Sequence, residues 1–131
     1  MRWSGVLLLI STILCSCASL ENRQRDGEFE DATSAYATAI RWGEFDVARH
    51  MRRLADPQSS KQPPVDNVKV TAYETLRTTH TTDGNEVNIT VRIDYYHIDT
   101  MKVKSITDQQ VWKYDNDDQH WYITTALPEF K

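Results

Sequence analysis

The sequence predicts an α+β domain in which two N-terminal helices pack on a curved, four-stranded antiparallel sheet. Two observations carry this prediction. Apolar residues recur every three or four positions over residues 28–54, which is the period of a helix, and every second position after residue 67, which is the period of a strand. Strands that follow helices, rather than alternating with them, are typical of an α+β architecture with the helices on one face of the sheet.

The length and the composition limit the classes of protein to consider. The chain has 131 residues, which is room for one domain. Its formal net charge of -4 has the wrong sign for a dedicated nucleic-acid binder, so nucleic acid is not an expected partner. Charged residues at 26% and hydrophobic residues at 40% indicate an ordinary folded domain rather than a disordered or fibrous chain.

The helical half of the domain is expected to contain two helices and a linker. The first helix is expected at about 28–42, with Asp26 as its N-cap and Gly43 as a left-handed C-cap. The second is expected at about 44–54 and ends before Pro57, because the residue before a proline is pushed out of the helical region. The residues expected to face inward from the second helix are Val47, Ala48, Met51 and Leu54. The proline-rich residues 55–67 are expected to be extended.

Four strands are expected after residue 67. The first spans about 67–78 and leads to a hairpin turn at Asp83-Gly84. The second has the cleanest alternation in the chain, since apolar residues occupy every second position in the set Val87, Ile89, Val91, Ile93 and Tyr95. The third spans about 101–114, and the fourth runs from Trp121 through Leu127 to Pro128, after a turn at 115–118.

The N-terminus has the layout of a secretory signal peptide. Arg2 precedes an apolar run from Gly5 to Leu14, and small residues follow it. The run is about ten residues long, whereas a membrane-spanning helix needs about 20. An ordinary cleaved signal peptide and an uncleaved anchor are the alternatives that stay open.

The residues Leu14-Cys15-Ser16-Cys17 resemble a bacterial lipobox, with an aliphatic residue three positions before the modified cysteine and a small residue just before it. The resemblance implies cleavage after Ser16 and acyl chains on Cys17, which anchor the protein to a membrane. Ala18 and Ser19 stand where an acidic residue would signal retention in the inner membrane, so the periplasmic face of the outer membrane is the expected location. The expected organisation is therefore a signal peptide at 1–16, a lipidated cysteine and tether at 17–26, and one α+β domain at 27–131.

Two segments resemble the nuclear transport factor 2-like superfamily, in which a curved sheet wraps round an N-terminal helix. The first is AYATAIRWGEFDVARHM at residues 35–51, where Gly43, Phe45 and Ala48 match the superfamily's helix, glycine break and second helix. The second is VWKYDNDDQHWYITTALPEF at residues 111–130, which is similar to its closing hairpin. A cystatin-like sheet on one helix is the alternative. The resemblance covers about residues 28–130 and implies a structural likeness, not an activity.

Catalytic and metal-binding residues are not expected. Enzymes of this superfamily place an acid or a histidine between helix and sheet, which draws attention to Asp94 and His97. Asp94 lies between Ile93 and Tyr95, which are expected to face inward, so its side chain is expected to point outward. The four histidines have no metal-ligand spacing, so no metal or other cofactor is expected.

The remaining features predict a non-catalytic binding or assembly module. The closing hairpin is rich in aromatic residues, and a basic helix face precedes it; the expected interface residues are Trp112, Tyr114, Trp121, Tyr122, Arg49, Arg52 and Arg53. The expected partners are the membrane, through the acyl chains on Cys17, and a second copy of the chain or an envelope protein. The alternative function is a small enzyme, or a binder of small hydrophobic ligands, that uses the cone between helix and sheet.

Overall fold

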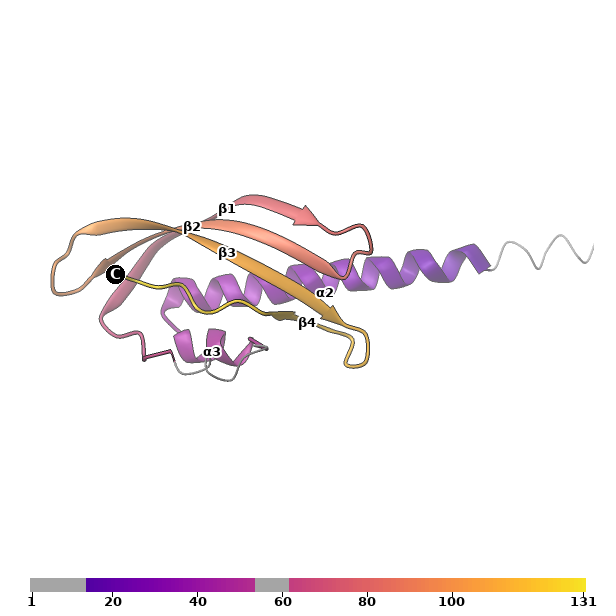
Figure 1. The fold of residues 1–131 in the computed structure, drawn as a ribbon, viewed down its shortest axis with the longest axis horizontal. Helices are drawn as coiled ribbons and strands as arrows, with labels where there is room; N and C mark the ends of the chain where they lie inside the picture. The colour runs from indigo at the N-terminus through magenta and orange to yellow at the C-terminus, as the bar shows by residue number, and fades with distance from the viewer. Residues whose placement is uncertain (1–13, 54–61) are drawn as a thin grey trace, which may run out of the picture. The chain divides into compact units, whose positions relative to one another are not determined.

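The computed structural model describes residues 14–53 and 62–131 (Figure 1). The chain divides into two units, residues 1–31 and 32–131. Helix α2 (Leu14–Trp42) crosses the division, so that its first part belongs to the first unit and its last part to the second. The architecture is α+β, as predicted: a helix, a short second helix and a four-stranded antiparallel sheet.

The first helix begins earlier than the predicted start at about residue 28. Residues 18–26 are helical, and Asp26 therefore lies inside α2 rather than at its start. The physical reason is intrinsic propensity, because this stretch is rich in Leu, Glu, Gln and Arg, which favour a helix without needing an apolar face. Gln24 Nε2 also donates to Glu28 Oε1 at 3.2 Å, one helical turn away.

In the second unit, residues 32–42 of α2 present an apolar face to the interior. Tyr36, Ala39 and Ile40 are exposed by no more than 2% and follow the predicted spacing of three and four residues. Gly43 ends the helix as predicted, with φ of 73°. The Gly43 N–H donates to Ile40 O and the Glu44 N–H to Ala39 O, which is the hydrogen-bond pattern of a Schellman motif.

Helix α3 (Phe45–His50) is shorter than the predicted second helix. Its buried residues are Phe45 and Ala48, one turn apart. The prediction that Val47 faces inward is wrong, since its exposed fraction is 52%. Once Phe45 sets the buried face, a residue two positions later points to the other side of the helix. Leu54, which was also predicted to face inward, lies outside the described residues.

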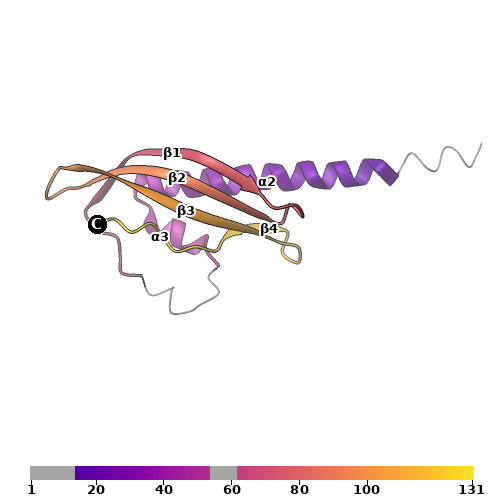
Figure 2. The ribbon, with the colours of Figure 1, turned by 45° about the horizontal axis from the view of Figure 1, so that its top comes forward.

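The sheet is an antiparallel meander with strand order β1-β2-β3-β4. The strands are β1 (Val68–His80), β2 (Glu86–His97), β3 (Val103–Asp115) and β4 (His120–Ile123). Figures 1 and 2 show residues 32–42 of α2 and helix α3 on the same side of these strands. The predicted hairpin turn is present, with Gly84 at φ of 71°.

Strand β2 is the centre of the core and confirms the predicted alternation. Its inner row has exposed fractions of 6% or less at Val87, Ile89, Val91, Ile93 and Tyr95. Trp112 of β3 lies directly opposite Val87 in the register and is 0% exposed. The Trp112 ring meets the Tyr36 ring edge to face, with centroids 5.7 Å apart, and so joins the helix to the sheet.

The two edges of the sheet differ from the regular centre. Strand β1 has register shifts between Val70 and Ala72 and between Thr75 and Arg77, and its residues from Glu74 to His80 are exposed. Strand β4 is shorter than predicted and ends at Ile123. The Ile123 carbonyl accepts from the Arg53 N–H at 3.0 Å, so the segment after α3 lies along this edge.

Candidate functional site

The lipidation residues fall at the start of α2. Leu14, Ser16 and Cys17 are helical, but their side chains lie outside the described residues, as does the apolar run before them. Acylation of Cys17 and cleavage after Ser16 therefore stay predictions. None of the helices in the described ranges is both long and apolar enough to cross a membrane.

The two tryptophans of the closing hairpin belong to the core rather than to an interface. Trp112 is 0% exposed and Trp121 is 8% exposed. Trp121 packs against the Tyr114 ring with centroids 5.3 Å apart. Because buried rings have no free surface for a partner, the predicted interface in this hairpin reduces to Tyr114 and Tyr122, which are both half-buried.

Tyr122 belongs to an ion-pair cluster around Arg53. The Arg53 guanidinium lies 3.7 Å from the centre of the Tyr122 ring. It also pairs with Asp115 and, at 2.8 Å, with Asp118. Backbone N–H groups of Asp117 and Asp118, followed by Arg53, hold the pKa of the Asp115 carboxyl below its usual range. This arrangement ties the acidic turn of the β3–β4 hairpin to the segment after α3.

The other two predicted interface arginines also contact groups of the same chain. Arg49 pairs with Asp46 at 2.8 Å and donates from Nη2 to the Pro63 carbonyl at 3.3 Å. Arg52 donates to Gln62 Oε1 at 2.8 Å, and burial lowers its pKa. These side chains hold residues 62–63 against the domain, which is a structural role that the sequence did not indicate.

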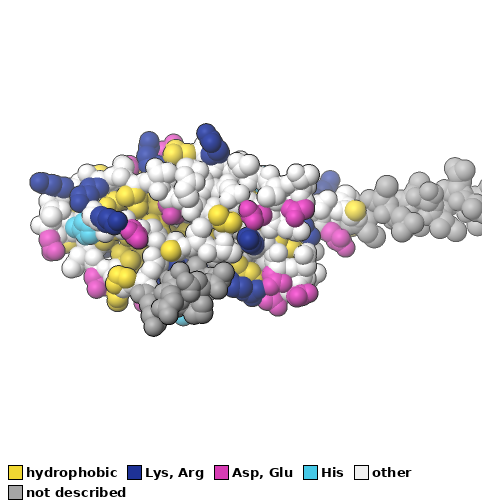
Figure 3. Space-filling model, viewed as in Figure 1, with side chains coloured by type: hydrophobic (Ala, Val, Ile, Leu, Met, Phe, Trp, Pro, Cys, Tyr) yellow, Lys and Arg dark blue, Asp and Glu magenta, His cyan; other side chains and the backbone are white. Residues whose placement is uncertain are grey.

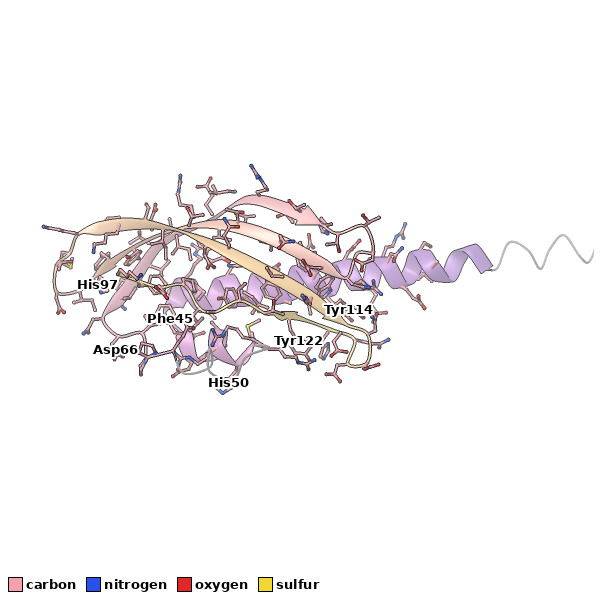
Figure 4. All side chains as sticks on the ribbon, in the orientation of Figure 1. Phe45, His50, Asp66, His97, Tyr114 and Tyr122 are labelled. Atoms are coloured by element: carbon pink, nitrogen blue, oxygen red, sulfur yellow. The ribbon has the colours of Figure 1, made fainter. Side chains whose placement is uncertain are left out.

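A surface groove of about 330 Å³ lies between residues 62–68 and residues 127–130. Its apolar lining comes from both segments and comprises Pro63, Pro64, Val65, Val68, Leu127, Pro128 and Phe130. Four polar side chains also line it: Gln62, Asp66, His97 and Glu129. Figure 4 shows Asp66 and His97 at the same end of the sheet, far from Tyr114 and Tyr122. The volume is at the lower end of the range for small-ligand sites.

The C-terminal wall of the groove is fixed at both ends by side chains. The Gln62 amide accepts from the Leu127 N–H at 2.9 Å and donates to the Leu127 carbonyl at 3.2 Å, as a neighbouring strand would. The Tyr95 hydroxyl accepts from the Lys131 N–H at 3.0 Å and donates to the Lys131 carbonyl at 2.6 Å. Between these two clamps, the Phe130 ring packs on Phe45 and Tyr95. The groove is therefore pre-formed rather than dependent on a ligand.

Within the domain, β3 carries a row of hydrogen-bonded polar groups. Gln110 Nε2 donates to Asp108 Oδ2 at 2.8 Å and to the Tyr73 hydroxyl at 2.9 Å. Gln110 Oε1 accepts from the Trp112 indole N–H at 3.1 Å. Burial raises the pKa of the Asp108 carboxyl, and it raises the pKa of Tyr73 to about 12. Tyr36 is 0% exposed, and burial followed by the Asp108 charge raises its pKa.

The Asp94 and His97 side chains do not come together as a catalytic pair. Asp94 accepts from the Ser105 hydroxyl across the sheet, whereas the His97 ring contacts the Tyr95 ring and lines the groove. Among the described residues, no group of three or more His, Cys, Asp or Glu side chains is placed to hold a metal ion.

Sequence reasoning missed both the groove and the polar row. The groove joins segments about 60 residues apart in the sequence, and no local pattern links them. The polar row did leave a signal, because Asp108, Gln110 and Trp112 recur at a spacing of two and so share one face of β3. Comparisons of this chain with protein-family models, with curated proteins and with solved structures found no match.

Proposed function

We propose that this protein is a lipid-anchored module that faces the periplasm from the bacterial outer membrane and binds a partner without catalysing a reaction. The anchoring part of the proposal rests on the sequence from Leu14 to Cys17. The binding part rests on one observation, the pre-formed groove between residues 62–68 and 127–130. Its mainly apolar lining with four polar side chains is the composition that recognition sites commonly have.

The fold is proposed to be of the nuclear transport factor 2-like or cystatin-like type. Support comes from the glycine break at Gly43 between two helices and from the burial of Phe45 and Ala48 just after it. The four-stranded meander that follows is compatible with both types. Proteins with such folds serve many functions, so the fold by itself does not decide the function.

Photo-crosslinking in the native envelope tests the binding role. A photoreactive amino acid is placed at Glu129 on the groove rim and, as a matched control, at Glu44, an exposed acid outside the groove. We expect a discrete adduct from position 129 that position 44 does not give. The adduct should disappear when Val65→Trp fills the groove. Identical patterns from the two positions would contradict binding in the groove.

The anchor is tested separately by Cys17→Ser. We expect this variant to accumulate as an unprocessed or soluble periplasmic form, because it lacks the acyl chains. Mass spectrometry of the mature wild-type N-terminus measures the modification directly. A Cys17→Ser variant that still runs at mature size and fractionates with the outer membrane would rule out lipidation at this residue.

A second candidate function uses the interior of the domain for a small apolar ligand or for catalysis. The observation that favours it is Asp108, a buried acid with a raised pKa that is joined to Tyr73 through Gln110. Against it, Tyr36, Ile40 and Trp112 fill the space between helix and sheet. Saturable fluorescence of an anilinonaphthalene dye with the folded protein, abolished by Ile40→Trp, would favour this candidate over the groove.

A further inference from the structure

The turn between β2 and β3 presents large apolar side chains to solvent. Ile98, Met101 and Val103 have exposed fractions of 46%, 66% and 66%; these three residues are called the apolar tip below. Single exposed apolar residues are normal on any protein. Three within six consecutive residues form a patch, and exposed patches mark sites of interaction.

The backbone of this turn shows that the apolar residues are not required by the fold. The His97 carbonyl accepts from the N–H groups of Thr100 and Met101 at 3.1 and 2.9 Å, which closes a tight turn. Met101 has φ of 54°, in the left-handed region that glycine and asparagine adopt most readily. A methionine at such a position, with its side chain in solvent, stabilises neither the turn nor the core.

Lysines outnumber acids in the turn that carries the apolar tip, since residues 98–104 contain Lys102, Lys104 and one acid, Asp99. Lys102 and Lys104 are exposed and alternate with Met101 and Val103 along the chain. Lys104 Nζ donates to the Lys131 carbonyl at 2.8 Å, while the Lys131 ammonium pairs with Glu129 at 2.9 Å and so adds no unbalanced charge. Figure 3 shows dark blue side chains at this end of the domain, with magenta acidic side chains among them. Apolar side chains interleaved with lysines are the chemistry that binds an anionic lipid surface.

The other two turns of the sheet do not share this composition. Residues 81–85 of the β1–β2 turn are Thr-Thr-Asp-Gly-Asn, and residues 116–119 of the β3–β4 turn are Asn-Asp-Asp-Gln. In an antiparallel meander, both turns lie at the opposite end of the strands from the β2–β3 turn. The end of the sheet that carries the apolar tip therefore differs in chemistry from the other end.

From these observations we propose that the apolar tip inserts into the headgroup region of a phospholipid surface that contains anionic lipid. Ile98, Met101 and Val103 enter the boundary between headgroups and acyl chains, while Lys102 and Lys104 contact lipid phosphates. This contact is independent of acylation at Cys17 and of the groove, so it can hold or fail separately from the proposed function.

The test measures the depth of a single nitroxide label on the full chain. Met101→Cys is labelled in a chain whose native cysteines are replaced by Cys15→Ser and Cys17→Ser, so that no acyl chain contributes. Thr82→Cys and Asn116→Cys, both exposed residues in the other two turns, serve as matched controls. Collisions of each label with oxygen and with a water-soluble paramagnetic reagent are compared with and without vesicles of phosphatidylethanolamine and phosphatidylglycerol.

With vesicles, we expect the label at position 101 to gain oxygen collisions and to lose collisions with the aqueous reagent, while the two control labels do not change. Lys102→Gln and Lys104→Gln should each reduce the ratio of immersed to aqueous label at position 101 about fivefold, since a lysine at an anionic surface contributes that much to binding. A label at position 101 that stays equally accessible to the aqueous reagent would overturn the proposal. Dipolar broadening of that label without vesicles would also overturn it, because a second copy of the chain would then cover the tip.

Discussion

The inward-facing residues of strands β2 and β3 are buried to a similar extent but differ in polarity. Val87, Ile89 and Val91 of β2 lie directly opposite Trp112, Gln110 and Asp108 of β3 in the register. Exposed fractions are 6% or less for the three β2 residues and 9% or less for the three β3 residues. One strand thus carries an apolar row, and its neighbour carries a row with a carboxyl, an amide and an indole N–H.

The difference shows how each kind of residue tolerates burial. An aliphatic side chain is stabilised by leaving water and needs only close packing. A buried polar group destabilises the fold unless it finds a hydrogen-bond partner. In β3 the partners are the neighbouring members of the same row, because Gln110 bonds to both Asp108 and Trp112. The β3 row should therefore respond to substitution as a connected unit, and the β2 row residue by residue.

The largest effect is expected from Trp112→Ala. This side chain is 0% exposed, donates to Gln110 and packs edge to face on Tyr36. Its removal should lower the free energy of unfolding by about 3–5 kcal/mol. Denaturant unfolding of the full chain measures this, with Val87→Ala in the facing position of β2 as the control for loss of packing alone. A loss for Trp112→Ala no larger than that for Val87→Ala would show that the hydrogen-bonded residues of β3 contribute no more to stability than the apolar residues of β2.

Gln110→Leu separates hydrogen bonding from packing. The substitution introduces an apolar side chain of similar size and leaves Asp108 and the Trp112 indole N–H without the amide. We expect a loss of about 1–3 kcal/mol, which is the penalty for unpaired buried polar groups. The conservative change Ile89→Val in the facing position should cost about 0.5–1.5 kcal/mol. A neutral or stabilising Gln110→Leu would mean that water replaces the lost partners.

The same contrast explains how far the sequence predicted the structure. In β2 every buried position is apolar, so alternation alone identified the strand and its inner face. In β3 the inner face carries Asp108 and Gln110, which a hydrophobicity pattern assigns to solvent. Trp112 was assigned to an interface because its buried neighbours were not recognised.

Other features depend on long-range contacts that no local pattern contains. The groove needs Gln62 to bind Leu127, 65 residues later. The exposure of Val47 follows from the burial of Phe45, whose ring packs on Phe130 late in the chain. The turns were predicted more reliably than these contacts, because Gly43 and Gly84 both adopt the positive φ that their positions predicted.

Asp108→Asn tests the charge in the β3 row through pH. Burial raises the pKa of Asp108 in the folded state above its unfolded value. Its contribution to stability is therefore fully present below the unfolded pKa and is lost as the pH rises through the folded pKa. Each unit of that rise corresponds to about 1.4 kcal/mol at neutral pH.

Asparagine keeps the hydrogen bond to Gln110 and carries no charge at any pH. We therefore expect Asp108→Asn to be more stable than the wild type at pH 7, with the advantage shrinking towards pH 4. Acids outside the core with a lowered pKa, such as Asp83 and Asp115, change stability in the opposite direction, but they do so in both proteins and cancel in the difference. An advantage that does not change with pH would contradict a raised pKa at Asp108.

The smallest effect is expected from removing single hydroxyl groups, and its sign should differ between two tyrosines. Tyr36 and Tyr95 are almost equally buried, at 0% and 1% exposure. Among the residues that the structure describes, the Tyr36 hydroxyl has no hydrogen-bond partner, whereas the Tyr95 hydroxyl bonds to both the N–H and the carbonyl of Lys131. Tyr36→Phe should therefore leave the free energy of unfolding unchanged or raise it by about 1 kcal/mol, since an unpaired buried group is lost. Tyr95→Phe should lower the free energy of unfolding by about 1–2 kcal/mol and release the C-terminal wall of the groove.

Amide hydrogen exchange at Lys131 measures the release of this wall, because the exchange should accelerate in Tyr95→Phe and not in Tyr36→Phe. Equal losses for the two variants would show that Tyr36 has a partner after all, with buried water as the first candidate.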